Sequence, residues 1–187
     1  MRILFGDIGT FKTALMLYLS KFREEPTFYI ATGKHIYYDI DTESLPKLRV
    51  IKSKSIFTDI ETVLELIRTP EESFIVIHDT LTANMLISRA YFREKIVAKS
   101  MLLILNTYRE LVDKKKGIVI LIDYVNKLTG KPISWRLSKY YVDSVVKSEI
   151  TPEKTLTLTL FDKRFEKLME INISLEYLKR EIFGISG

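Results

Sequence analysis

The sequence predicts an α/β fold in which a mostly parallel central sheet is flanked by helices and extended by antiparallel strands at its C-terminal end. Three observations predict it. Short apolar runs alternate with amphipathic helical segments over the first two thirds of the chain. A glycine-containing turn joins the first of these strands to its helix. From Tyr140 onward, β segments separated by polar turns follow one another without helices between them, which favours antiparallel pairing.

Strand and helix patterns alternate in the first part of the chain. Apolar runs predict strands at 2–5, 27–31 and 48–51. Apolar residues at helical spacing predict helices at 12–22 and from about 57 to 68. A strand, a glycine turn and a helix in this order are typical of the first βα unit of a nucleotide-binding sheet.

Two strongly apolar runs in the middle of the chain end on aspartate. Residues 74–77 lead to His78 and Asp79, and residues 118–122 lead to Asp123. Continuous apolar runs of this kind predict central parallel strands that are buried on both faces. The remaining predicted elements are one long amphipathic helix at about 88–115 and late strands at 141–146, 155–161 and 168–173.

The composition excludes several kinds of site. The 187 residues carry a formal net charge of +5, no cysteine and two histidines. Disulfides, cysteine-ligated zinc and thiol catalysis are therefore excluded, and a histidine-rich metal site is not expected. No linker-like stretch and no internal repeat divides the sequence, so we expect a single domain spanning 1–187.

Amino-acid usage also bears on location and growth temperature. No segment approaches the roughly 18 apolar residues of a membrane span, and no signal peptide opens the chain. We therefore expect a soluble, cytoplasmic protein without a membrane partner. The lack of cysteine and glutamine is typical of proteins in which thermolabile side chains are selected against, as in thermophiles.

The turn after the first strand carries the strongest functional signal. It fits the phosphate-binding pattern G-x-x-x-x-G-K-[ST] at every fixed position but one, because Phe11 stands at the second glycine position. In such a loop, backbone amides surround the phosphates, the lysine reaches the β and γ phosphates and the hydroxyl binds Mg²⁺. The matching residues are Gly6, Asp7, Ile8, Gly9, Thr10, Phe11, Lys12 and Thr13.

An ordinary βα turn with a chance glycine and lysine is the alternative interpretation of this segment. Phe11 favours it, because a bulky residue in a left-handed or crowded conformation costs about 1 to 3 kcal/mol. Asp79 favours the phosphate loop, because ligands bind at the carboxyl ends of parallel strands and a carboxylate there can support Mg²⁺. We expect the neighbouring His78 to be a hydrogen-bonded core residue.

In combination, these motifs resemble the RecA-like recombinase ATPases, and specifically the small, RadB-like RadA paralogues of archaea. The matching segments keep the family's order over nearly the whole chain. They are the loop at 6–13, the run Ile77-His78-Asp79-Thr80-Leu81-Thr82-Ala83, the strand 118–123, Lys131-Pro132 and Asp162-Lys163-Arg164-Phe165.

The resemblance implies a RecA-like P-loop core that binds ATP and Mg²⁺, with a neighbouring subunit or a partner recombinase completing the site. Lys12 and Thr13 would contact phosphate and Mg²⁺, and Asp79 would support the metal during catalysis. Lys163 and Arg164 fall where the family places basic residues that reach an adjoining subunit's phosphates. Because the chain begins at the phosphate-loop strand, we expect no N-terminal DNA-binding domain.

Besides the start of the chain, two departures from the family pattern concern hydrolysis. The glutamate that normally follows the second strand is missing, which leaves Glu43, and more weakly Asp41, as candidate general bases. Asp123-Tyr124 replaces the family's Asn-Gln, and a chain without glutamine has no γ-phosphate sensor of that type. Residues 28–31 spell the family's Phe-x-x-Ala polymerisation tag, but they lie in a predicted core strand.

Basic and aromatic residues are interleaved in two segments that match the family's DNA-facing loops. Arg89 and Arg93 lie near Tyr91 and Phe92, while Lys127 and Lys131 precede Trp135 and Arg136. This mixture suits single- or double-stranded DNA, since bases stack on aromatic rings and phosphates attract cations. A solvated helix face beside core aromatics is the alternative.

Two functional hypotheses follow. The first is an ATP-binding RecA/RadA paralogue that acts as an accessory, or mediator, in homologous recombination and DNA repair, with weak or absent hydrolysis. Its partners would be DNA and a RadA-type recombinase, another paralogue or further copies of itself. The second is a protein-interaction scaffold whose phosphate loop has decayed. A small-molecule phosphotransferase is a distant third, because no arginine-rich lid segment is evident.

Overall fold

The computed structural model describes residues 1–32 and 47–183, which contain a sheet of eight strands in the order β3-β2-β4-β5-β1-β6-β7-β8. The five strands from β3 to β1 and the next strand, β6, are parallel, and β7 and β8 extend the sheet in antiparallel fashion. This arrangement confirms the predicted α/β class with a mostly parallel sheet and an antiparallel extension. The first late strand, β6, was expected to pair in antiparallel fashion, but it pairs parallel with β1. The strands are β1 (Arg2–Gly6), β2 (Thr27–Ala31), β3 (Leu48–Lys52), β4 (Ile75–His78), β5 (Ile118–Tyr124), β6 (Ser144–Ile150), β7 (Thr155–Asp162) and β8 (Lys167–Ser174).

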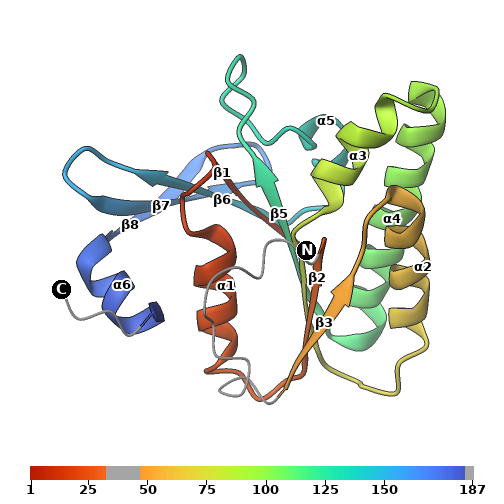
Figure 1. The fold of residues 1–187 in the computed structure, drawn as a ribbon, viewed down its shortest axis with the longest axis horizontal. Helices are drawn as coiled ribbons and strands as arrows, with labels where there is room; N and C mark the ends of the chain where they lie inside the picture. The colour runs from red at the N-terminus through yellow and green to blue at the C-terminus, as the bar shows by residue number, and fades with distance from the viewer. Residues whose placement is uncertain (33–46, 184–187) are drawn as a thin grey trace.

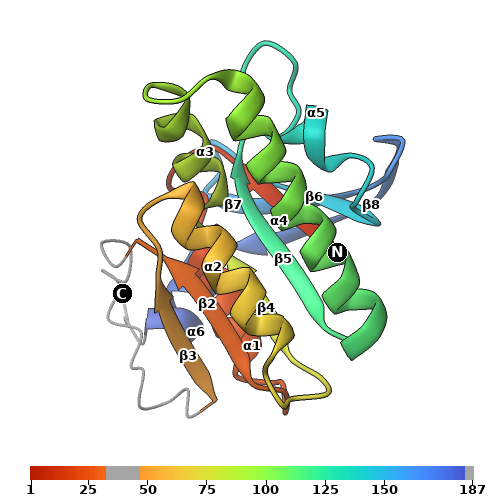
Figure 2. The same cartoon turned by 90° about the vertical axis from the view of Figure 1, so that its right-hand side faces the viewer.

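Helices cover the two faces of the sheet unequally (Figure 1). Three lie together on one face, and Figure 2 shows two of them, α2 and α4, in front of the strands. The other face carries α1 and α6, which contact each other. The helices are α1 (Lys12–Ser20), α2 (Ile56–Ile67), α3 (Leu81–Arg89), α4 (Glu94–Lys115), the short α5 (Trp135–Ser138) and α6 (Leu175–Phe183).

The largest hydrophobic cluster lies between the sheet and α2 and α4. It includes Ile3, Phe28, Val76 and Val119 from the strands, and Leu105 from α4. All five residues of β2 are buried, as expected for a parallel strand between two neighbours. The interpretation of residues 28–31 as core is therefore confirmed, and this segment is not available as an exposed polymerisation tag.

Two helix predictions were wrong. The predicted helix at 88–115 starts too early, because α4 begins at Glu94 after the backbone of Arg93 turns to an extended conformation (φ −59°, ψ 138°). The separate helix α3, which ends at Arg89, was not predicted. Apolar spacing continues across this break, so periodicity alone does not reveal it. The prediction also missed α6, whose nine residues are too few to stand out from the preceding strand. Among the late strands, the first begins at Ser144 instead of 141.

A fully buried polar network fastens α2 and α4 to the end of β4. His78 Nε2 lies 3.0 Å from Asp59 Oδ1 of α2, and the Tyr108 hydroxyl of α4 lies 2.7 Å from His78 Nδ1. Ser53 and Asn84 also donate to the Asp59 carboxylate. Burial on its own raises the pKa of Asp59, but the charge and hydrogen bonds of these partners outweigh it, so the pKa is lowered. The expectation that His78 is a hydrogen-bonded core residue is confirmed.

We predict that Asp59→Ala lowers the free energy of unfolding by about 3 to 5 kcal/mol, because it leaves the buried partners of the carboxylate unsatisfied. The matched control is Asp113→Ala, which removes an exposed carboxylate that pairs with Arg109 at 3.2 Å and costs less than about 1 kcal/mol. Urea denaturation measures both. Equal losses in the two variants would show that the network around His78 does not stabilise the fold.

Candidate functional site

The predicted phosphate loop joins β1 to α1 at the edge of the sheet where the parallel strands end. Gly6 lies so close to β6 that a Cβ atom there would stand 2.1 Å from the carbonyl oxygen of Ser148. The Ser148 hydroxyl also donates to the carbonyl oxygen of Thr10 at 2.8 Å. The loop is therefore held from outside by β6, a strand about 140 residues later in the sequence.

Phe11 stands at the second glycine position of the phosphate-binding pattern, and it adopts the backbone conformation that glycine adopts most easily. Its backbone is left-handed (φ 54°, ψ 18°), directly before the first residue of α1. The side chain packs against the hydrophobic cluster that α1, β7 and α6 form, which includes Leu15, Leu156 and Leu178. Burial of the ring in this cluster offsets the backbone cost of about 1 to 2 kcal/mol.

Lys12 is buried at the centre of the loop. Its Nζ donates to the carbonyl oxygens of Asp7 at 2.6 Å and Gly6 at 3.1 Å, and to Thr10 Oγ1 at 3.2 Å. Burial lowers the pKa of this ammonium, and the carboxylates of Asp79, Asp7 and Asp123 oppose the shift. If an anion replaced one of these oxygen acceptors, it would bind a Lys12 ammonium group that has already lost its water.

Asp79 connects the loop to the centre of the sheet. Its Oδ2 accepts hydrogen bonds from Thr13 Oγ1 at 2.6 Å and from the buried Tyr29 hydroxyl at 3.0 Å. Burial raises the pKa of Tyr29, and the charge of Asp79 adds to this rise, so Tyr29 acts as a donor. Sequence reasoning missed Tyr29, because a tyrosine inside a core strand gives no signal of its own.

Together these side chains line a pocket of about 320 Å³. Lys12, Thr13 and Asp79 bring a cation, a hydroxyl and a carboxylate into it, and Tyr124 forms part of the wall with its ring centroid 5.5 Å from Lys12 Nζ. The residues that line the pocket are Ile8, Gly9, Thr10, Phe11, Lys12, Thr13, Ala14, Asp79, Ile122 and Tyr124. The volume lies at the lower end of the range of small-ligand sites.

The donor set fits a magnesium ion that arrives with a phosphate ligand. Within 1–32 and 47–183, no group of three or more histidine or acidic side chains could hold a metal by itself. One hydroxyl and one carboxylate, Thr13 and Asp79, are the protein ligands that Mg²⁺ typically uses when phosphate oxygens and water complete its shell.

Asp123 and Tyr124 have separate roles. The Asp123 carboxylate is buried and accepts from the backbone N–H and the hydroxyl of Ser134 at 3.0 and 2.6 Å. Burial raises the pKa of Asp123, although these hydrogen bonds act to lower it. Asp123 therefore shapes the segment between β5 and α5, and Tyr124 is the residue that faces the pocket.

Other predicted residues lie elsewhere. Glu43 and Asp41 fall outside the described residues. Lys163 and Arg164 occupy the turn between β7 and β8. They are not part of the pocket of their own chain, and their role towards an adjoining subunit stays a prediction.

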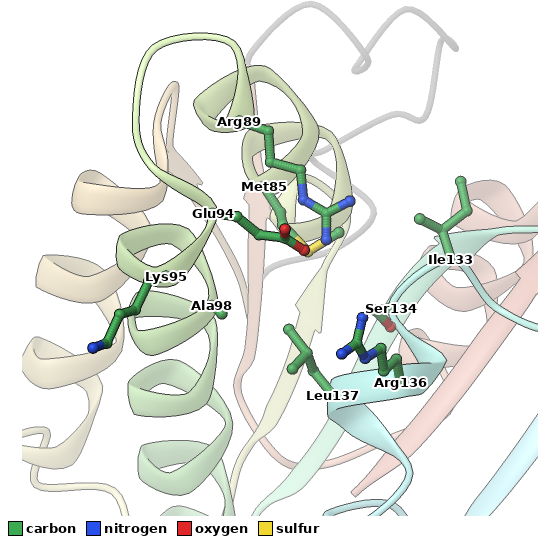
Figure 3. Close-up of a pocket in the computed structure, with 9 residues that line it drawn as sticks. All are labelled: Met85, Arg89, Glu94, Lys95, Ala98, Ile133, Ser134, Arg136 and Leu137. Carbon is green, nitrogen blue, oxygen red and sulfur yellow. The ribbon is translucent and has the colours of Figure 1, made fainter.

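Of the predicted DNA-binding residues, Arg89 lies at a second pocket, of about 360 Å³, between the α3–α4 region and α5 (Figure 3). Figure 3 shows the guanidinium groups of Arg89 and Arg136 directed into this space, with Glu94 as the acidic residue of its wall. Among the described residues neither arginine forms an ion pair. The sequence indicated cations in both segments but not that Arg136 faces Arg89.

The remaining predicted cations are spread around this region. Arg93 is the residue before α4, and Lys127 is an exposed residue of the segment between β5 and α5. Lys131 lies with its Nζ 5.1 Å from the centroid of the Phe165 ring. The structure does not gather all four predicted residues into a single site.

Comparisons with known proteins do not assign the chain: no family model and no curated protein matches it. Among the described helices, none has both the length and the apolar character needed to cross a membrane.

We predict that Gly6→Ala lowers the free energy of unfolding by about 3 kcal/mol, because its methyl group collides with a backbone carbonyl that cannot move without distorting β6. Gly9→Ala is the matched control. Gly9 also has a positive φ, of +84°, but no atom lies within 4 Å of its Cβ position, so the cost is only the backbone penalty of about 1 to 2 kcal/mol. Chemical denaturation compares the two, and a larger loss for Gly9→Ala would contradict the close approach of β1 and β6.

Proposed function

We propose that the protein is an ATP-binding accessory of the RecA/RadA paralogue type that acts in homologous recombination and DNA repair. The observation that carries the proposal is the convergence of Lys12, Thr13 and Asp79 in one pocket at the carboxyl edge of a parallel sheet. This edge is where open α/β sheets bind ligands. The assignment to recombination rests on the resemblance of the motifs.

In this proposal each residue has a defined task. Backbone amides of the loop surround the β and γ phosphates, and Lys12 exchanges carbonyl partners for phosphate oxygens. Mg²⁺, when bound, would neutralise phosphate charge. Thr13 offers its hydroxyl to the metal, while Asp79 stays oriented by the donors Thr13 and Tyr29.

The described residues that line the pocket support slow or absent hydrolysis. Asp79 is the only carboxylate among its described lining residues, and it is already hydrogen-bonded to Thr13 and Tyr29. A general base has to reach the attacking water, and efficient catalysis needs donors placed where charge develops on the γ phosphate. Tyr124 stands where the resembling family carries a glutamine, and an aromatic ring does not replace its amide.

A scaffold that does not bind nucleotide is the second candidate. The observation that favours it is the self-contained loop, in which Lys12 is satisfied by three oxygen atoms of its own chain. Binding of ATP then has to replace hydrogen bonds that already exist. Nucleotide affinity decides between the two candidates.

We predict that the protein binds ATP with Mg²⁺ and that Lys12→Ala weakens this binding at least about a hundredfold, because the variant removes a charge-assisted contact to phosphate. Isothermal titration calorimetry measures the affinity, and single-turnover assays measure hydrolysis. Lys139→Ala is the control, since Lys139 lies over the Tyr140 ring, away from the loop. Absence of ATP binding in the wild type would favour the scaffold.

DNA binding is a separate part of the proposal, supported by the guanidinium groups of Arg89 and Arg136 at the second pocket, neither of which forms an ion pair with a described residue. We predict that the double variant Arg89→Ala, Arg136→Ala weakens binding of single-stranded DNA and lowers the slope of log affinity against log salt by about one to two units. Lys114→Ala, at the other end of α4, is the control. Fluorescence anisotropy at several salt concentrations measures both, and an unchanged slope would remove these arginines from the interface.

A further inference from the structure

A large apolar groove opens on the face of the sheet that carries α1. Its volume is about 600 Å³, and it is lined by one side of α1 and by the strands from β4 and β5 across to β8. Leu19 and Phe22 form the wall near the end of α1, and Met169 and Ile171 of β8 lie on the opposite side. Ile120 of β5 belongs to the floor.

The groove exposes more apolar surface than scattered hydrophobic residues do. Leu19 and Phe22 are 46% and 68% exposed, and Met169 and Ile171 are 47% and 45% exposed. All four face the same groove, so they form one continuous patch. Continuous apolar patches on soluble proteins mark sites of interaction, whereas single exposed residues do not.

The architecture indicates what kind of element fits. Parallel strands such as β5, β1 and β6 are normally covered by helices on both faces. Here α2, α3 and α4 cover one face, whereas α1 and α6 lie on the other (Figure 1). Among the described residues, the groove opens beside α1 on that second face. An α-helix with an apolar stripe at i, i+3 or i+4, and i+7 is the element that completes such a layer.

The charged residues at the groove indicate the sign of the charge that the occupant should carry. Arg2 and Arg23 are its only charged residues among those described, and both are positive. Both lie at the end of the groove where β1 begins, because α1 runs back to that edge before β2 starts. Arg23 already bonds to Glu25 at 2.8 Å, whereas Arg2 forms no ion pair with any described residue.

We propose that this groove is the docking site for an amphipathic helix of a partner protein, with its apolar stripe on α1 and β8 and an acidic side chain at the end that meets Arg2. The groove and the phosphate loop lie at different places on the sheet, since the loop follows the end of β1 and the cations lie at its start. The proposal does not depend on nucleotide binding. It gives the accessory protein a surface for its partner.

The probe is a hydrocarbon-stapled helical peptide of about four turns, with leucine on one face and glutamate on the other, and a twin with lysine in place of glutamate. Anisotropy at low salt measures binding of both labelled peptides to the full chain. We expect the glutamate peptide to bind a few-fold more tightly than the lysine twin, because an exposed charge pair contributes little. Arg2→Glu should reverse this order.

Leu19→Glu tests the apolar wall, and it should weaken binding of the glutamate peptide about tenfold or more. Leu103→Glu is the matched control, because Leu103 of α4 is also 46% exposed but lies outside the groove. Circular dichroism confirms that both variants fold. ATP affinity, measured in parallel, separates failure of this site from failure of the nucleotide site.

Three results would overturn the proposal. One is no binding of either peptide to the wild-type protein. Another is equal weakening by Leu19→Glu and Leu103→Glu, which would mean that the peptide binds apolar surface in general. The third is a wild-type dimer in sedimentation experiments that Leu19→Glu converts to monomer, because a second copy of the chain would then cover the groove.

Discussion

The close approach of Gly6 to β6 is the constraint on which the candidate site depends. There is no room for a side chain between the Gly6 backbone and the Ser148 carbonyl oxygen, and the Ser148 hydroxyl fixes Thr10 in the same loop. Lys12 then finds its carbonyl partners because the loop is closed around it. The phosphate loop therefore takes its shape from its own sequence and also from the register between β1 and a strand that follows much later in the chain.

Phe11 illustrates how a local cost is offset by distant packing. Its left-handed backbone is the conformation that the glycine of the pattern adopts freely, and the ring is held by a cluster to which β7 and α6 contribute. The C-terminal part of the chain is thus involved twice in the site, through Ser148 and through the cluster around Phe11. Loss of α6 or β7 would remove support from a loop at the other end of the sequence.

The sequence predicted what local patterns encode. Apolar runs located the strands of the parallel sheet, and the glycine turn before Lys12 located the loop, because periodicity and turn chemistry are properties of neighbouring residues. It did not reveal Tyr29 as a donor to Asp79, nor that Arg89 and Arg136 line one pocket, because these residues come from separate elements. The break before α4 was missed because the apolar spacing continues across it, and α6 was missed because nine residues give too short a pattern to stand out from β8.

Helix α1 connects the two surfaces that we propose for ligands. Its first turn supplies Thr13 to the pocket around Lys12, and its last turn supplies Leu19 to the groove. The helix is short, and its middle is held by Leu15 and Leu17 in two separate clusters on the sheet. A rigid body anchored in this way lets the two ends bind different partners at the same time, because neither surface uses the side chains of the other. An accessory protein that holds a nucleotide without rapid turnover and presents a separate face to its partner needs this separation.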